Sequence, residues 1–228
     1  MINMEKYITD SFMESFDGLM LGDGCVSKSK VYKNYRYTQD CKYHEWLDCI
    51  KNLFFTNGFK SDIYVTKAYG DRKPNSSYNL NSSSIGFFTE QHKRWYIKDY
   101  NIDEYPTRLW HLDEDTGEYF AWHKTIPIDI ILTPECVLNW YLGDGGLYKQ
   151  TYRKSYFIQI ATCGFTEREV EHLIFLLNDQ VVDCAHYIRS SNTIQISKKS
   201  GVNMFLDYLG NLNKPNCYAY KFQDKLAN

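Results

Sequence analysis

The tetrapeptide Leu-Gly-Asp-Gly occurs twice in this chain and each time closes an apolar run with helical spacing. The longer segments are FDGLMLGDG, which ends at Gly24, and VLNWYLGDG, which ends at Gly145. The C-terminal end of a helix is the negative end of its dipole, so a carboxylate there is unfavourable unless a cation is near. Each of these two helix ends therefore requires a cation nearby.

The order of expected elements also occurs twice. Apolar periodicity and turn residues predict two passes of the form helix, two strands, helix, two strands, helix. The expected helices cover 5–22, 41–57 and 86–97 in the first pass and 133–142, 166–179 and 201–210 in the second. We expect an α+β protein of two pseudo-symmetric αββαββα repeats, at 1–97 and 133–228, with its site on the pseudo-two-fold axis. Residues 98–132, rich in acids and aromatics, are expected to form an ordered linker.

Composition excludes several classes of protein. With 228 residues, 43% of them hydrophobic, the chain can bury a large core. It has no apolar run of membrane-spanning length, and MINMEKYITD has no signal-peptide core, so we expect a soluble, intracellular protein with no membrane partner. The choice between a prokaryotic cytoplasm and an organelle matrix stays open. Seven cysteines without a CxxC, and six histidines without HExxH spacing, support neither a disulfide framework nor a zinc site.

The distribution of charge favours a nucleic-acid partner although the net charge is −2. Four segments, at 24–40, 60–73, 145–163 and 183–199, together carry a charge of +10. Acidic residues gather at 99–118, where Arg108 is the one base. A basic face with acids placed elsewhere gives this pattern. Chance alternation of charge on solvated strands is the competing interpretation.

The paired motifs resemble those of the LAGLIDADG homing endonucleases, in the single-chain form with two motifs. The similarity extends to KTIPIDIILTPECVLNWYLGDGG, IATCGFTEREVEHLI, TIQISKKS and YAYKF, in this order. It implies an intron- or intein-encoded endonuclease whose repeats each present a saddle-shaped antiparallel β-sheet to the DNA major groove. Such an enzyme acts as a monomer and cuts both strands of a long, non-palindromic double-stranded DNA site by metal-dependent hydrolysis, which leaves 3′ overhangs.

Small residues on the two motif helices suit a close helix contact. Gly18 and Gly22 give the first helix a strip without side chains, and Asn139 and Gly143 occupy the matching positions of the second. Asp23 would then lie beside the equivalent aspartate of the other helix.

The carboxylates Asp23 and Asp144, with the carbonyls of Gly22 and Gly143, would form a cation site made only of oxygen. Oxygen ligands suit Mg²⁺, which keeps some of its waters, and we expect Mn²⁺ to substitute for it. A lone Asp-Gly would indicate only a helix C-cap. The duplication favours a metal site.

Other catalytic residues follow from the resemblance. It implies a basic residue near each phosphate, at Lys124 in KTIP and at Lys221 in YKF, where a surface lysine is the competing interpretation. It also implies a role for Gln39 in ordering water, whereas the second repeat has Cys163 at the matching place.

Strand alternation predicts which side chains reach the DNA, because every second residue of a strand points to the same face. Long polar side chains suit the base edges of the major groove. Ordinary polarity of exposed strands is the alternative. The candidates are Lys28, Lys30, Tyr35, Tyr37, Lys67, Tyr69, Lys149, Arg153, Tyr156, Arg189 and Gln195, with Lys198 a weaker one on the same face.

Two other functions fit the same fold. The chain could be a maturase that binds intron RNA, or a DNA-binding regulator without catalysis. Asp23 and Asp144 favour the nuclease, since a protein that only binds has no need of paired acids.

Overall fold

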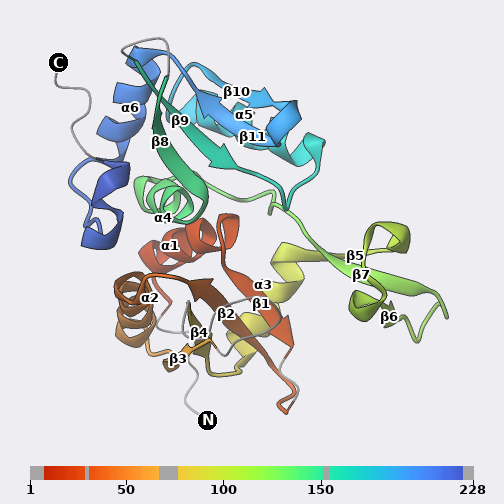
Figure 1. Cartoon of the computed structure of the whole chain (residues 1–228). Helices are drawn as coiled ribbons and strands as arrows, with labels where there is room; N and C mark the ends of the chain where they lie inside the picture. Colours follow the sequence, from red (N-terminus) through yellow and green to blue (C-terminus); the bar gives the residue numbers. More distant parts are fainter. Residues whose placement is uncertain (1–7, 29–30, 67–76, 151–154, 223–228) are drawn as a thin grey trace.

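The computed structural model describes residues 8–28, 31–66, 77–150 and 155–222 and shows two halves that meet at one pair of helices (Figure 1). These central helices are α1 (Asp10–Leu21) and α4 (Pro134–Asp144), and each leads into one Leu-Gly-Asp-Gly segment. Both begin at a threonine whose hydroxyl accepts a hydrogen bond from a backbone amide of the first turn, Thr9 in α1 and Thr133 in α4. Such N-caps fix the start of a helix.

The first half forms a four-stranded antiparallel sheet with helices on one face. Its strand order is β1-β2-β4-β3, and α2 and α3 pack against it. The elements are β1 (Cys25–Lys28), β2 (Tyr35–Cys41), α2 (His44–Thr56), β3 (Ser61–Val65), β4 (Tyr78–Ser82) and α3 (Gly86–Trp95). α2 ends where the sequence predicts, before Gly58, which has a φ of 81° that disfavours other residues.

The second half has the same plan. Its antiparallel sheet has the order β10-β11-β9-β8, with α5 against β10 and α6 against β9. The elements are β8 (Gly145–Lys149), β9 (Tyr156–Ala161), α5 (Glu167–Gln180), β10 (Ala185–Ile188), η4 (Arg189–Ser191), β11 (Thr193–Ile196), α6 (Lys199–Leu209) and η5 (Asn216–Lys221). The expected α+β fold of two pseudo-symmetric repeats is confirmed.

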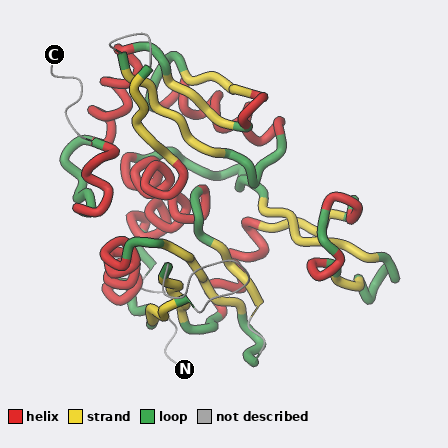
Figure 2. Tube along the Cα trace, in the orientation of Figure 1, coloured by secondary structure: helices red, strands yellow, loops and turns green. Residues whose placement is uncertain are grey.

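The segment between the halves is more than a linker. It forms a third antiparallel sheet, of order β5-β7-β6, that projects from the body as a separate lobe (Figures 1 and 2). Its elements are β5 (Tyr96–Asp99), η2 (Ile102–Glu104), η3 (Thr107–Leu109), β6 (His111–Leu112) and β7 (Tyr119–Lys124). The third helix therefore ends at Trp95 and not at 97, because Tyr96 begins a strand that pairs with Lys124.

The core lies between the helices and the inner faces of the sheets. In the first half Phe16, Phe54 and Phe88 pack around the fully buried ring of Tyr37, and Phe12 and Phe59 pack against Phe54. In the second half the buried apolar residues of α5, β9 and β11 belong to the same core; they are Val170, Leu173, Leu177, Ile158, Ile160, Ile194 and Ile196. Burial of such side chains provides most of the driving force for folding.

All seven cysteines are free thiols in the structure, and of them Cys136 alone is fully buried. Among the described residues, no helix is both long and apolar enough to cross a membrane.

Candidate active site

The two motif helices touch at their small residues. A Cβ atom built on Gly18 would lie 2.1 Å from the carbonyl oxygen of Cys136 and 2.8 Å from Cβ of Asn139. Near the helix ends, a Cβ on Gly143 would lie 3.3 Å from Cα of Gly22. The predicted close contact is present, and it brings the two Leu-Gly-Asp-Gly segments together.

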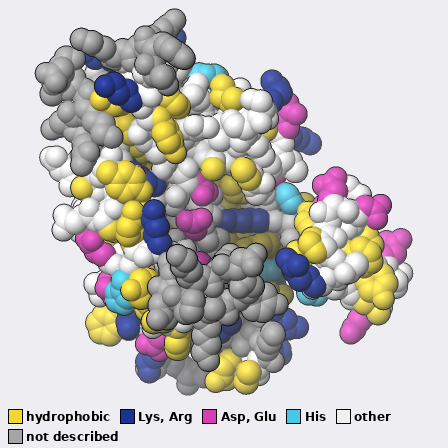
Figure 3. Space-filling view, viewed as in Figure 1, with side chains coloured by type: hydrophobic (Ala, Val, Ile, Leu, Met, Phe, Trp, Pro, Cys, Tyr) yellow, Lys and Arg dark blue, Asp and Glu magenta, His cyan; other side chains and the backbone are white. Residues whose placement is uncertain are grey.

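Asp23 and Asp144 line one open cavity of about 530 Å³ between the two halves. Figure 3 shows acidic side chains in the hollow between the halves, with Lys or Arg side chains on either side. The other lining residues are Asp40, Cys41, Lys42, Gly143, Gly145, Gly146, Leu147, Tyr148, Tyr218, Tyr220 and Lys221.

Asp23 and Asp144 ionise less readily than exposed aspartates, because the pKa of each is raised. Burial, reinforced by the charge of Asp23, raises the pKa of Asp144 to about 7. Burial also raises the pKa of Asp23, and the positive charges of Lys124 and Lys221 oppose this shift. Part of the Asp23 residue remains exposed to solvent at the open side of the cavity. Crowded carboxylates of this kind gain stability when a cation binds between them.

Two lysines complete the charged cluster. Lys124 Nζ donates to the carbonyl oxygens of Gly22 and Gly24, at 3.1 and 3.0 Å. Lys221 Nζ donates to those of Tyr141 and Leu142, at 3.0 and 2.7 Å. Burial lowers the pKa of each ammonium to about 8, although the nearby acids oppose this. Each lysine therefore lies at the C-terminal end of one motif helix, where a positive charge is favoured.

The donor set fits a divalent cation that retains water. The groups that would hold it are the carboxylates of Asp23 and Asp144, which line the cavity, and the backbone carbonyls of Gly22 and Gly143, where the two helix ends approach each other. The Gly22 carbonyl also accepts from Lys124, which leaves it one lone pair. No three His, Cys, Asp or Glu side chains in the described ranges converge as a metal cage. Two carboxylates with water and substrate oxygen suit Mg²⁺ better than zinc.

Gln39 is buried next to this site and does not line the cavity. Its Oε1 accepts a hydrogen bond from the hydroxyl of Tyr37. The Tyr37 ring lies against Gly24, where a Cβ atom would meet its hydroxyl at 2.8 Å. The placement of Tyr37 among the DNA-contacting residues is therefore wrong, because the side chain is wholly buried.

The register of the strands corrects the partner of Gln39 in the second repeat. Cys25 pairs with Thr38 in the first sheet, and the equivalent Gly146 pairs with Gln159 in the second. Gln39 therefore corresponds to Ile160, which is fully buried. Cys163 lies three residues further on, exposed in a turn.

The sequence-based assignment of strand faces is wrong by one residue at several positions. Tyr35 packs toward the helices, with its ring centroid 4.0 Å from that of His92, and Tyr156 packs against the core. Lys28 and Lys149 share the inner parity of Val26 and Leu147 but are exposed because they end their strands. Gln195, which pairs with His186 and Gln159, does point away from the helices. Outward positions in the two sheets also include Arg36, Thr38, Asn79, Asn81, Tyr148 and Thr193.

Most of the other residues expected to contact DNA either lie away from the outer faces of the sheets or fall outside the described residues. Arg189 is held by Glu167 and Glu171 of α5, at 2.5 and 3.2 Å, so its guanidinium faces a helix. Lys198 is exposed at the start of α6. Lys30, Lys67, Tyr69 and Arg153 lie outside the described residues.

Sequence reasoning missed several residues at the cavity. Asp40 and Lys42 follow Gln39 and line the site, and so do Tyr218 and Tyr220. Alternation along β2 places Asp40 on the face opposite Gln39, but it does not show which of the two faces is buried.

No family model matches the chain, and two proteins are related to it by sequence. An uncharacterised protein of Methanocaldococcus jannaschii is 29% identical over 178 residues, which are 74% of this chain and 58% of that protein. Cytochrome b mRNA maturase bI2 of Debaryomyces hansenii is 25% identical over 184 residues, 78% of this chain and 59% of that protein. The chain thus spans less than two thirds of the length of the curated relatives it matches.

Solved structures show the fold. The homing endonuclease I-WcaI, bound to its DNA recognition sequence, has a TM-score of 0.66 at 19% identity, over 95% of this chain and 88% of that one. The LAGLIDADG meganuclease I-AabMI, bound to uncleaved DNA, has a TM-score of 0.56 at 14% identity, over 96% and 89%. The N-terminal LAGLIDADG domain of DUF199/WhiA has a TM-score of 0.51 at 12% identity, over 92% and 86%. The resemblance carried by the two motifs is confirmed, and the chain has the fold of the LAGLIDADG homing endonucleases, with both motif helices in one polypeptide.

Proposed function

We propose that this chain is a site-specific endonuclease that cuts both strands of a long, non-palindromic DNA duplex and leaves 3′ overhangs. The observation that carries the proposal is the meeting of Asp23 and Asp144 in one cavity, flanked by the ammonium groups of Lys124 and Lys221. A pure binding protein would incur the cost of crowding these charges without any benefit. Two of the solved neighbours are endonucleases in complex with DNA.

The proposed mechanism assigns a separate task to each group. Asp23 and Asp144, with the carbonyls of Gly22 and Gly143, would hold Mg²⁺ or Mn²⁺ against the scissile phosphates. Such a cation supplies a nucleophile at neutral pH and stabilises the charge of the leaving oxygen. Each lysine, with a pKa of about 8, would place positive charge where the pentacoordinate phosphate becomes more negative.

DNA would lie across the outer faces of the two sheets. Residues 1–97 and 133–228 would each cover one half of the site, and 98–132 would join them. Gln39, through its hydrogen bond with Tyr37, would fix the backbone near Gly24. Thr38, Gln159 and Gln195 would face the edges of the DNA bases. Because the halves differ in sequence and both motifs lie in one chain, the active particle would be a monomer on an asymmetric site.

The decisive experiment uses the uninterrupted form of the locus into which the reading frame is inserted. Wild-type protein with Mg²⁺ should cut it at one position, and Asp144→Asn should not. Sedimentation of the DNA complex should show one protein chain per duplex. Binding without cleavage in either Mg²⁺ or Mn²⁺ would refute the nuclease and support a DNA-binding regulator.

A maturase role is the second candidate, because one of the sequence relatives is named as an mRNA maturase. Its test is splicing of the surrounding intron with and without the protein. Asp144→Asn should leave splicing intact and abolish DNA cutting, because RNA binding does not need the paired acids.

A further inference from the structure

Lys124 is fixed at two points by opposite halves of the molecule. Its Nζ is bound to the Gly22 and Gly24 carbonyls at the end of α1, in the first repeat. Its backbone lies at the end of β7, and the next two residues, Thr125 and Ile126, are hydrogen-bonded to α5 of the second repeat. The neighbours of Lys124 in the chain decide where that backbone lies.

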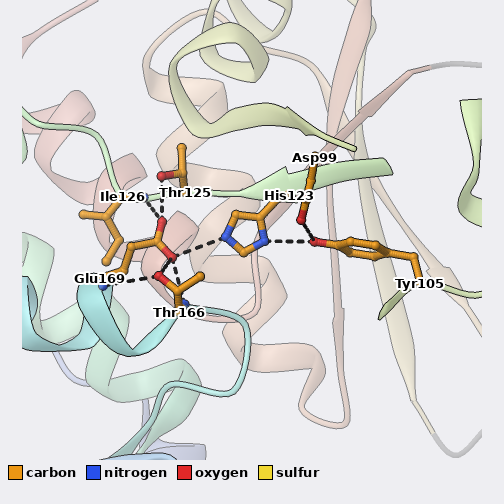
Figure 4. A network of polar contacts seen from close by, with 7 residues as sticks. All are labelled: Asp99, Tyr105, His123, Thr125, Ile126, Thr166 and Glu169. Carbon is orange, nitrogen blue, oxygen red and sulfur yellow. Dashed lines mark hydrogen bonds and ion pairs between the residues drawn. The ribbon is translucent and has the colours of Figure 1, made fainter. Parts of the chain in front are cut away.

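One carboxylate of α5 binds residues on both sides of Lys124. Glu169 accepts from the Thr125 hydroxyl at 2.6 Å and from the Ile126 amide at 3.3 Å, and it lies 3.3 Å from His123 Nε2 (Figure 4). Burial by itself would raise the pKa of the Glu169 carboxyl, but the hydrogen bonds from His123, Thr125 and Thr166 outweigh it and lower that pKa to about 2. Glu169 therefore holds the end of β7 in the position from which Lys124 reaches the end of α1.

Lys221 has the corresponding arrangement with the halves exchanged. Its Nζ is bound at the end of α4, in the second repeat. The segment that carries it, η5, begins with the amides of Asn216 and Cys217, which donate to the two oxygens of Glu45 at 2.7 and 2.9 Å. Glu45 lies in the first turn of α2, in the first repeat, as Glu169 lies in the first turn of α5.

We propose that Glu45 and Glu169 are a pair of positioning residues. Glu169, in the second repeat, fixes the position of Lys124, whose ammonium binds the end of α1 in the first repeat. Glu45, in the first repeat, fixes the position of Lys221, whose ammonium binds the end of α4 in the second. The proposal rests on the proposed endonuclease function for its effect on cutting, but its geometry does not. A charged acceptor makes shorter and stronger hydrogen bonds than a neutral one, so a glutamate fixes a strand end better than a glutamine. A small displacement of a catalytic group costs much of its effect.

The two anchors differ in strength. Glu169 is partly buried and contacts three residues beside Lys124, whereas Glu45 is exposed and holds two amides that lie four or five positions before Lys221. We therefore expect the larger effect from Glu169. If Glu45 and Glu169 only stabilised their helices, each substitution would lower the stability of the whole protein. Cleavage of the two DNA strands would then slow equally.

The first test uses no catalysis. Metal-free protein labelled with ¹³Cε-lysine is examined by NMR at one pH, and the two signals are identified by their loss in Lys124→Met and Lys221→Met. Glu169→Gln should move the Lys124 signal and leave that of Lys221, and Glu45→Gln should do the reverse. The matched controls Asp179→Asn in α5 and Asp48→Asn in α2 should move neither signal. Unchanged lysine signals in both glutamine variants would overturn the proposal.

The second test follows each DNA strand separately in single-turnover cleavage. Glu169→Gln should slow the same strand as Lys124→Met, by roughly tenfold, and Glu45→Gln the same strand as Lys221→Met, by less. Equal slowing of both strands would reject positioning in favour of capping. If wild-type protein does not cut, the proposed function fails, and the NMR result still decides the positioning.

A milder variant guards against loss of the fold. Thr125→Val removes one hydrogen bond to Glu169 and leaves the Thr166–Glu169 capping box in place. It should move the Lys124 signal in the same direction as Glu169→Gln and lower the melting temperature less than Glu169→Gln does, because the capping box remains. A Lys124 signal that stays in place in this variant would also count against the proposal.

Discussion

Gly18 of α1 lies so close to the carbonyl of Cys136 in α4 that a methyl group there would be 2.1 Å from the oxygen. Backbone cannot yield as a flexible side chain can, so Gly18→Ala must push the two motif helices apart. We expect the free energy of unfolding to fall by about 3 kcal/mol, at the upper end of the range for overpacked sites. Urea unfolding followed by circular dichroism measures this.

Gly86→Ala is the matched control. Gly86 begins α3, and a Cβ there meets no atom within 4 Å. Alanine should leave stability unchanged or raise it by up to about 1 kcal/mol, since it is the better helix former. Equal stability of the two variants would show that the helices are not in close contact.

Asp144→Asn should remove cleavage and stabilise the metal-free protein. The pKa of Asp144 is raised to about 7 in the fold, so its contribution to stability is fully present below the unfolded value near 4 and is lost as pH rises to about 7. Asparagine cannot ionise and does not show this loss. We expect the melting temperature of the variant to exceed that of wild type at pH 8 and the difference to vanish toward pH 4. A lower melting temperature than wild type at pH 8 would contradict the assigned crowding of charge.

DNA affinity should fall steeply with salt despite the acidic isoelectric point. Lys28 is exposed at the end of β1, and its loss in Lys28→Gln should reduce the slope of log affinity against log salt by about 1. Arg189→Gln should not change the slope, because Glu167 and Glu171 already hold that guanidinium. Fluorescence anisotropy between 50 and 200 mM salt measures both. An affinity that does not change with salt would contradict the prediction that basic residues on one face bind the DNA phosphates.

Neighbouring residues of β11 should separate specificity from stability. Gln195 points outward and Ile194 is fully buried. Gln195→Ala should relax discrimination at one or two base pairs, by about 1–3 kcal/mol, and leave unfolding unchanged. Ile194→Ala should cost about 2–5 kcal/mol of stability and keep the base preference. Cleavage of single-substituted targets, with unfolding curves, tests the pair. The reverse outcome would mean that the face assignment is inverted.

The sequence was sufficient for the helices and their order because helix signals are local. Thr133 and Pro134, for instance, mark the start of α4 without reference to the rest of the chain. The duplication then indicated that Asp23 and Asp144 meet. The sheet faces were harder, because alternation shows which residues share a face but not which face is buried. Tyr35 and Tyr37 were therefore assigned to the wrong face as a pair.

Contacts distant in sequence could not be predicted. The equivalence of Gln39 and Ile160 depends on strand register, which is set by pairing between separate strands. The bonds from Glu45 to Asn216 and Cys217 join residues more than 170 positions apart. A glutamate in the first turn of a helix ordinarily indicates only a favourable dipole contact. Nothing in its local sequence distinguishes an anchor from a cap.

The crossed attachment of Lys124 and Lys221 also bears on how such a chain can be inherited. Glu169 holds the segment that follows the first repeat, and Glu45 holds the segment that ends the second. The two repeats are therefore not exchangeable modules. A hybrid gene that joined one half of this protein to a half from a distant homologue would keep both motif helices. The glutamate that positions each lysine and the segment that carries that lysine would then come from different proteins. Recombination between such genes should be productive only where both ends of each attachment travel together.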